Sequence, residues 1–445
     1  MSIESDGDRI PPSQQQRLSL GRQARNRVSR SKLVTINPKK RGFDPIAILL
    51  QSARHRVPRL LPVKYQRMSA SPFAFFRGAV SIMAADLGAQ PHTDLTVQLC
   101  GDAHVQNLGS FEAPDGRIVF DINDFDETIA GPWEWDVKRM AASIVLAGLE
   151  SDHNEADSSR AVEDFAASYV TTIEELADRP ILAAARFQVH RLGESEAISS
   201  ALRQAERAQP GDLLAKYTAE NAKGRPRFKR VEHVLWRITG EPKKDILCAL
   251  PSYRKSLPAE RLHLFDFFIP RDVAFKVVGT GSVGLRDYVV LMEGNGPGDP
   301  LFLQIKQEVA SAYAPYLKPG NHVHQGRRVA EGLRKIQPIS DLLLGWTRIE
   351  EEDFLVRQLN DHKGKVDLAN LGGEGLNKLA GIAGVLLARG HARSGDALAI
   401  KGYIGTPDKV IKSIVHYGTE YADLTRADFE LFRKAIEQGR IKVAS

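Results

Sequence analysis

Residues Leu99 to Ser143 read LCGDAHVQNLGSFEAPDGRIVFDINDFDETIAGPWEWDVKRMAAS, and this stretch holds more reactive side chains than any other part of the chain. Within it, Asp115-Gly116 stands between two apolar runs. An Asp-Gly pair in that position is a strong signal for a β-hairpin. We therefore expect two short paired strands, at Leu108–Phe111 and at Arg117–Ile122.

Polar residues lie on both sides of the expected hairpin: Asp102 and Asn107 precede it, and Asp124 follows it. Pairing of the strands brings these side chains together at one end. Phosphoryl transfer requires such a set, because one carboxylate accepts the proton of the attacking hydroxyl while an amide oxygen and a second carboxylate bind Mg²⁺. The sequence thus predicts Asp102 as the catalytic base, with Asn107, Asp124 and Asp126 as metal ligands.

The same segment resembles known families. Gly-Asp-x-His-x-x-Asn, followed by an apolar strand, Asp-Phe and Trp-Asp, is similar to the catalytic segment of aminoglycoside and choline phosphotransferases in the protein-kinase-like superfamily. With Phe-Phe-Arg-Gly upstream and Gly-Pro-Trp-Glu-Trp-Asp-Val-Lys-Arg downstream, the longer pattern resembles a bacterial family catalogued as domain of unknown function 2252, from about Asp44 onward. The kinase resemblance implies a two-lobed α+β fold, ATP and Mg²⁺ as cofactors, and Asp136 as a buried brace for the loop of Asp102. The sequence departs from the kinase pattern at one position: two residues before Asp102, Cys100 replaces the usual histidine.

A glycine-rich segment begins at Ala274 and reads AFKVVGTGSVGLRDYVVLMEGNGPGDPLFLQIKQE. Its G-x-G-x-x-G pattern serves both dinucleotide-binding folds and kinases. Since Asp287–Met292 is β-branched and aromatic, we expect a strand there and not the helix that a Rossmann turn requires. A second strand, Leu301–Ile305, ends at Lys306, which we assign as the lysine that pairs with the nucleotide phosphates. The loop residues assigned to the nucleotide are Gly279, Thr280, Gly281, Ser282 and Gly284.

The nucleotide lysine of a kinase is held by a carboxylate on the next helix. A helix is expected over Val323–Leu344, and Glu331 is its candidate partner for Lys306. Two strands should follow, Leu342–Thr347 and Phe354–Leu359, and the end of the second, at Gln358 and Leu359, would bind the adenine base.

The order of these parts carries a structural prediction. Asp102 and Asp124 precede Lys306 by about two hundred residues, whereas kinases place the glycine-rich loop and its lysine first. We therefore predict a circularly permuted kinase-like fold, in which the helix Leu376–His391 returns beside the strand that ends at Leu99. Lys306 and Asp124 should then lie about 4 Å apart.

Length and composition limit the compartment and the domain organisation that can be expected. The chain has 445 residues, a net charge of +6 and two cysteines. Because no apolar run approaches the roughly 18 residues of a membrane span and no apolar signal core is present, we expect a soluble cytoplasmic protein without a membrane partner. We divide the chain into a basic mobile arm (1–43), a helical large-lobe part with the catalytic loops (44–265), a small β-rich lobe (266–360) and a helical return (361–445). The arm alone does not predict a nucleic-acid partner.

The expected function is Mg-ATP-dependent phosphoryl transfer to a hydroxyl group of an unidentified small molecule or protein. Three alternatives stay open: nucleotidyl (AMP) transfer with ATP held in reverse, a metal-dependent phosphohydrolase built on Asp121, Asp124 and Asp126, and a non-catalytic nucleotide-binding scaffold. Isolated aspartates usually form turns or caps, and Asp115 receives that interpretation. Arg77, which follows a run of aromatic residues, either fixes a loop or reaches a phosphate.

Overall fold

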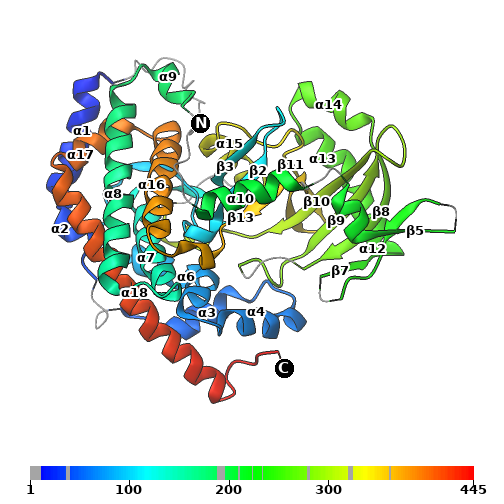
Figure 1. Cartoon of the computed structure of the whole chain (residues 1–445), viewed down its shortest axis with the longest axis horizontal. Helices are drawn as coiled ribbons and strands as arrows, with labels where there is room; N and C mark the ends of the chain where they lie inside the picture. Colours follow the sequence, from blue (N-terminus) through cyan, green and yellow to red (C-terminus); the bar gives the residue numbers. More distant parts are fainter. Residues whose placement is uncertain are drawn as a thin grey trace, which may run out of the picture.

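The computed structural model describes residues 12–36, 41–187, 196–208, 211–222, 224–232, 234–277, 281–318, 324–359 and 362–444. Helices gather on one side of the molecule and a six-stranded antiparallel sheet forms the other side (Figure 1). The chain starts in the helical part, passes through the sheet and returns to the helices. It is therefore a mixed α and β protein, as expected.

The helical part is organised around α7 (Glu134–Glu150), which is buried from its first residue to Gly148. Packed against α7 are α8 (Glu155–Asp178), α16 (Gly375–Ser394) and α18 (Pro407–Glu437). None of the described helices combines the length and the apolar composition that crossing a membrane requires. The remaining helices of this part are α3 (Pro45–Ser52), α4 (Leu61–Met68), α5 (Pro72–Gly78), α6 (Val80–Gly88), α9 (Ile181–Ala185) and α17 (Ala397–Ile404).

The prediction of a mobile arm is wrong for residues 12–36. They form α1 (Gln14–Arg27), which begins with a capping box, and α2 (Arg30–Leu33). α1 packs against α17, and Arg17 forms an ion pair with Asp396 at 2.8 Å. The backbones of α1 and α17 approach so closely at Gly21 that a Cβ atom there would stand 1.9 Å from the carbonyl oxygen of Ala399. Small residues, and not an apolar stripe, allow this contact, so hydrophobic periodicity gave no sign of it. Residues 1–11 and 37–40 of the predicted arm lie outside the described residues.

The six-stranded sheet has the order β11-β12-β10-β9-β8-β7. One face packs on α12 (Glu241–Cys248), α13 (Leu250–Ser256) and α14 (Ala259–Asp266) through a core that includes Leu303 and Ile305. Gln304, Lys306 and Glu308 alternate with those residues and point to the opposite face, called the site face below. The strands are β7 (Leu235–Arg237), β8 (Ile269–Lys276), β9 (Asp287–Glu293), β10 (Pro300–Glu308), β11 (Gly345–Ile349) and β12 (Glu352–Gln358).

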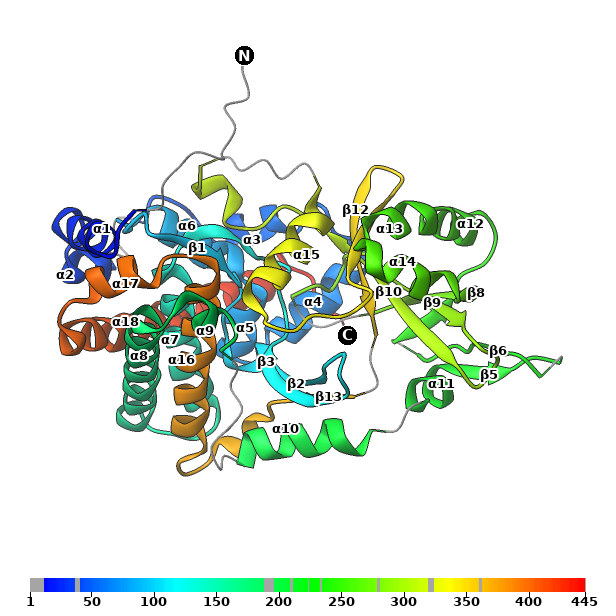
Figure 2. The same cartoon turned by 90° about the horizontal axis from the view of Figure 1, so that it is seen from above.

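Two smaller sheets carry the segment of Asp102 and Asp124. β1 (Thr96–Leu99) pairs with β4 (Ile129–Pro132), and β2 (Leu108–Glu112) pairs with both β3 (Ile118–Ile122) and β13 (Lys363–Lys365). The β2–β3 pair is the predicted hairpin, and Gly116 turns it with a φ of +81°. Helix α10 (Glu196–Arg207) runs along this sheet (Figure 2). An insertion made of α11 (Asp212–Tyr217), β5 (Thr218–Glu220) and β6 (Pro226–Phe228) covers part of the site face.

Candidate functional site

The loop after β1 is held by a buried carboxylate. Asp136 accepts hydrogen bonds from the backbone N–H groups of Cys100 (2.7 Å) and Gly101 (3.0 Å), and its side chain is 1% exposed. Gly101 has a φ of +89°, and a Cβ atom there would stand 2.2 Å from the carbonyl oxygen of Glu127. Only glycine fits this turn. His391 lies 3.4 Å from Asp136, and α16 contacts β1, so this helix ends beside the strand that leads to Gly101.

Asp102 is paired with an arginine that the sequence analysis missed. Arg139 on α7 is fully buried and places Nε 2.7 Å and a terminal nitrogen 2.6 Å from Oδ1 of Asp102. The other carboxylate oxygen lies 3.7 Å from Nε2 of His104. Burial, with the positive charges of Arg77 and Arg139, lowers the pKa of His104 well below its ordinary value, so this imidazole is neutral. Asp102 is therefore fixed from one side only. In the sequence, Arg139 follows Trp-Glu-Trp-Asp by three residues, and this position close to Asp136 could have indicated a role near the Asp102 loop.

Asn107 is oriented by the same loop. Its Nδ2 donates a hydrogen bond to the carbonyl oxygen of Asp102 at 2.8 Å, so its side-chain oxygen is left to accept or to ligate. The carbonyl of Asn107 accepts from the backbone N–H of Asn123 at 2.8 Å. This backbone contact sets Asp124, the next residue, beside Asn107, as the predicted hairpin requires.

Lys306 meets the two aspartates of the Asp-Phe-Asp segment, 180 residues away in sequence. Its ammonium group lies 3.9 Å from Oδ1 of Asp124, close to the predicted distance, and forms a shorter ion pair with Asp126. Asp126 also accepts a hydrogen bond from Ser282 at 2.8 Å. The carboxylate of Asp126 is thus shared between the lysine and the glycine-rich segment, while the side chain of Asp124 stays 42% exposed.

Electrostatics separates the two aspartates. Burial and the negative charge of Asp126 raise the pKa of Asp124 to about 6, although solvent screens part of this effect. Burial would raise the pKa of Asp126 too, but the charge and hydrogen bond of Lys306 lower it well below the ordinary value. Burial lowers the pKa of Lys306, and the carboxylates of Asp126 and Asp124 outweigh that effect and raise it. Lys306 and Asp126 are therefore a charged pair, and Asp124 is the carboxylate available to a ligand.

The assignment of Glu331 as the partner of Lys306 is not what the structure shows. In α15 (Gln325–Ile336), Glu331 pairs with Arg327 on the outer side, with 39% of its side chain exposed. Arg328 points inward instead and donates to the carbonyl oxygens of Asp126 and Val309, at 2.9 Å and 2.8 Å, and to that of Thr128. The helix therefore contacts the Asp-Phe-Asp segment through a cation bound to its backbone. Helical phase decides this, because the consecutive positions 327 and 328 point in different directions: Arg328 faces inward, whereas Arg327 faces outward with Glu331 four residues on.

Glu308 is a further buried group near Lys306. It lies two residues on along β10, is 3% exposed, and one of its carboxylate oxygens has no hydrogen-bond partner among the described residues. Burial and the negative charge of Asp126 raise the pKa of Glu308 well above its ordinary value. The sequence Lys-Gln-Glu places Glu308 near Lys306, but an acidic residue at the end of a strand is not by itself a signal for a functional site.

The glycine-rich segment lies beside this cluster where it is described. Gly279 and Thr280 lie outside the described residues. Gly284 has a φ of +95°, and its carbonyl accepts from the N–H of Val57 at 2.7 Å, which attaches the segment to the helical part. Gly281 faces α5, since a Cβ atom on it would stand 4.0 Å from the carbonyl oxygen of Arg77. Together with the bond from Ser282 to Asp126, these contacts join the segment to the Asp102 region.

Arg77 extends toward the same place. Its Nε is buried without a hydrogen-bond partner among the described residues, and its guanidinium lies 5.9 Å from the ring of Phe73. Burial lowers its pKa, and the negative charges of Asp102, Glu150 and Asp124 oppose this. A buried guanidinium with an unused donor, acted on by the charges of nearby carboxylates, is suited to binding an anion.

The predicted base-binding positions do not offer free backbone N–H groups. The N–H of Gln358 donates to Asp341 at 2.5 Å, and the N–H of Leu359 donates to the carbonyl oxygen of Phe302 at 2.8 Å. Tyr217 of α11 and Phe228 of β6 pack on the apolar end of the site face, close to Leu359. The expected role of Gln358 and Leu359 in base recognition is therefore not met by this arrangement.

The described residues contain no group of three or more His, Cys, Asp or Glu side chains placed to hold a metal ion. Asn107 and Asp124 nevertheless offer an amide and a carboxylate oxygen, which suit Mg²⁺, a cation that takes one or two protein ligands and completes its shell with water and phosphate oxygens. Asp126, the third predicted ligand, is engaged by Lys306 and Ser282. Asp121 is directed elsewhere, since it is 4% exposed and pairs with Arg389 at 2.5 Å.

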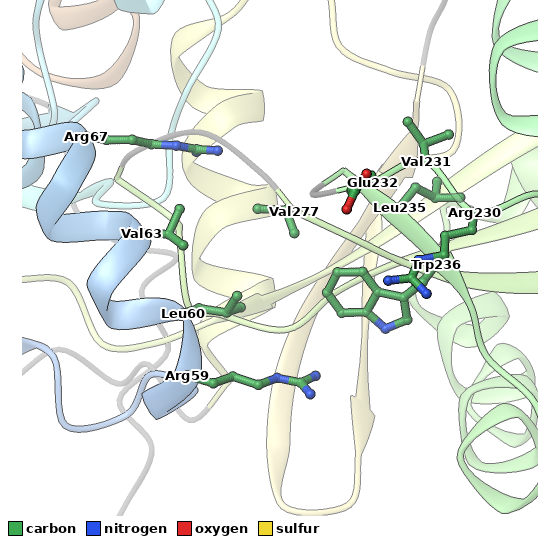
Figure 3. Close-up of a pocket in the computed structure, with 10 residues that line it drawn as sticks. All are labelled: Arg59, Leu60, Val63, Arg67, Arg230, Val231, Glu232, Leu235, Trp236 and Val277. Atoms are coloured by element: carbon green, nitrogen blue, oxygen red, sulfur yellow. The ribbon is translucent and has the colours of Figure 1, made fainter. Parts of the chain in front are cut away.

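A cavity of about 530 Å³ lies outside this cluster, between α4 and the segment around β7 (Figure 3). Arginine side chains reach it from both sides, and Arg59 lies over the ring of Trp236 at 5.8 Å. Val277, which lines it, lies two residues before the first glycine of the G-x-G-x-x-G pattern. The residues that line it are Arg59, Leu60, Val63, Arg67, Arg230, Val231, Glu232, Leu235, Trp236 and Val277.

Comparison with known proteins places the chain in a family. No curated protein and no solved structure matches it. A family model described as "Uncharacterized protein conserved in bacteria (DUF2252)" matches residues 56–435, a span that includes the Asp102 loop, the Asp-Phe-Asp segment, the glycine-rich segment and Lys306. The chain therefore belongs to the DUF2252 family of proteins conserved in bacteria.

Proposed function

We propose that this protein is a magnesium-dependent phosphotransferase with a circularly permuted kinase-like core, which transfers a phosphoryl group from a nucleoside triphosphate such as ATP to a hydroxyl acceptor. The observation that carries the proposal is the contact between Lys306 and the Asp124–Asp126 segment, beside an Asn107 that Asp102 orients. Phosphoryl transfer depends chiefly on positioning and charge neutralisation, and these residues supply both.

The path of the chain supports the permuted order. β8, the glycine-rich segment, β9 and β10 with Lys306 are followed by α15, β11 and β12. The chain then enters β13, which pairs with β2 of the Asp102–Asp124 hairpin, and α16 ends at the loop of Asp102. In a kinase the glycine-rich loop, the lysine strand and the next helix precede the catalytic loop. Here the corresponding elements lie in the C-terminal half of the chain, and the chain returns from them to the loop of Asp102.

Each residue receives a role from its contacts. Asp102 orients the acceptor hydroxyl and accepts its proton through the carboxylate oxygen that Arg139 does not bind. The side-chain oxygen of Asn107 and the carboxylate of Asp124 hold the metal ion, which neutralises charge on the phosphates when bound. Lys306, already protonated beside Asp126, binds phosphate oxygens by a small rearrangement.

One observation favours a second candidate, nucleotidyl transfer on the same residues. The N–H groups of Gln358 and Leu359 are engaged, and Tyr217 and Phe228 cover the apolar end of the site face. A base would then bind elsewhere, as it does when the nucleotide enters in reverse. The phosphohydrolase alternative is disfavoured because Asp121 is held by Arg389 and cannot join Asp124 and Asp126.

The test is incubation of the purified protein with Mg²⁺ and ATP labelled at either the α or the γ phosphate, with an extract of bacterial metabolites as acceptor. Transfer of the γ label supports phosphotransfer, and transfer of the α label supports the second candidate. An Asp115→Asn variant, at the exposed hairpin turn, is the control and should transfer label as the unaltered protein does. Absence of any labelled product and of ATP hydrolysis would refute both candidates.

A further inference from the structure

Three basic side chains lie near enough for their charges to act on one another: Lys276 of β8, Arg357 of β12 and Lys363 of β13, called the cation cluster below. Sheet register places the first two on the site face. Lys276 stands in the row of Asp287 and Lys306, and Arg357 is paired with Gln304, whose side-chain oxygen it contacts at 3.1 Å.

Lys363 reaches this face from the other sheet. A Cβ atom on its neighbour Gly364 would stand 1.8 Å from the carbonyl oxygen of Ala201 in α10, so that side of β13 is filled by the helix. Side chains alternate along a strand, and Lys363 and Lys365 therefore project away from α10. Lys363 is half-buried, and Lys365 is exposed at the rim.

No carboxylate among the described residues forms an ion pair with the cluster. Among the described residues, neither Lys276 nor Lys363 has a carboxylate within 4 Å, and Arg357 contacts only a neutral amide. Asp287 and Asp341 are the nearby acids. Asp287 accepts a hydrogen bond from Gln304 at 2.6 Å, and Asp341 accepts from the backbone N–H groups of Leu343 and Gln358.

The charges act on one another. Burial lowers the pKa of Lys363 to about 7, with the positive charges of Arg357, Lys276 and Lys365 adding to the effect and Asp341 opposing it. Burial also lowers the pKa of Lys276, against the attraction of Asp287. Repulsion between half-buried like charges raises the free energy of the unliganded protein. A bound anion would reduce this repulsion, so the cluster favours an anionic ligand.

We propose that the cation cluster is a phosphate-binding site, and that the protein takes a ligand whose chain of phosphates extends from Lys306 toward β13. Arg357 connects the two regions, since its charge acts on both Lys306 and Lys363. Inorganic polyphosphate and a nucleoside triphosphate held in reverse share this chemistry. The inference requires phosphate binding only, so it holds whichever reaction takes place at Asp102.

The experiment is calorimetric titration of the full-length protein with inorganic tripolyphosphate at pH 8, in two buffers with different ionisation enthalpies. Lys363 is mostly neutral at that pH, and a bound phosphate raises its pKa, so binding should take up a proton from the buffer. Lys363→Met should abolish this uptake and weaken binding roughly 10- to 100-fold, the loss expected for one charge-assisted contact. Lys276→Met should weaken binding by a similar factor and keep the uptake.

The control is Lys409→Met, an exposed position on α18, which should bind tripolyphosphate as the unaltered protein does. Retained affinity in both cluster variants, or no binding by the unaltered protein at millimolar tripolyphosphate, would overturn the inference. Repeating the titration with ATP and ADP identifies the source, because a larger loss for ATP than for ADP in Lys363→Met assigns the γ phosphate to the cluster. Tripolyphosphate binding without any ATP turnover would refute the proposed phosphotransfer and leave this site intact.

Discussion

The roles of Asp102 and Asp124 can be separated by two matched substitutions, Asp102→Asn and Asp124→Asn. Asp102 carries the ion pair with Arg139, which is fully buried, and its removal as alanine would leave that guanidinium without a carboxylate at a cost of about 3–5 kcal/mol. Asparagine keeps an oxygen that can accept from Arg139, although it removes the negative charge, so we expect a smaller loss of stability than with alanine. The substitution removes the base while keeping a hydrogen-bond acceptor for Arg139.

We expect Asp102→Asn to lower the rate of γ-phosphate release from Mg-ATP by roughly 10²–10⁴-fold, the usual contribution of a general base, with little change in ATP affinity. Asp124→Asn should act on binding. It removes one charged metal ligand, and a charge-assisted contact contributes about 1.5–3 kcal/mol, which corresponds to roughly 10- to 100-fold in the Kd of Mg-ATP. The greater exposure of Asp124 favours the lower end of that range.

Two measurements check the separation: calorimetric titration with a non-hydrolysable ATP analogue and Mg²⁺, and single-turnover release of labelled phosphate. Thermal unfolding of both variants confirms that they are folded. Equal loss of nucleotide affinity in the two variants would show that Asp102 and Asp124 do not have distinct roles, and the proposed mechanism would be wrong.

Three further predictions concern cations near the site. Lys306→Ala should weaken Mg-ATP binding about 10- to 100-fold in the same titration, and Lys306→Arg should not restore it, because a planar fork does not replace a compact ammonium. Arg77→Ala should lower the rate of phosphate release about 10³-fold with a smaller change in ATP affinity, as an arginine that neutralises the transferred phosphoryl group would, and an unchanged rate would assign Arg77 to structure. Burial lowers the pKa of Lys64 well below its usual 10.5, so the unfolded chain binds more protons than the folded chain and the free energy of unfolding rises with pH. Lys64→Met should therefore flatten the rise in Tm between pH 7 and pH 9. A parallel rise in Tm in both proteins would contradict this.

Local sequence determined the hairpin and the set of residues near it. An Asp-Gly turn between apolar runs has few alternative conformations, so β2, β3 and the approach of Asn107 to Asp124 followed directly. The prediction that Lys306 contacts Asp124 relied on a resemblance and on chain order, and the 3.9 Å distance agrees with it. Composition alone would not have joined segments so far apart.

Helical phase and close packing were decided by the tertiary structure. Glu331 is the acid expected of α15, but in the folded chain Arg328 points inward, and Glu331 pairs with Arg327 on the outer side of the helix. The ordered α1 was missed because Gly21 allows contact with α17 through its lack of a side chain, and no apolar period records that.

The strongest charges of the site also depended on the fold. Asp126 takes the shorter ion pair with Lys306, and Arg139 binds Asp102. The charges of Lys276, Arg357 and Lys363 act on one another from three separate strands. Sequence fixes which residues can be charged and which strands can form. Whether those charges face a neighbour, a ligand or solvent depends on distances between segments, and these are set only when the two sheets and the helices pack together.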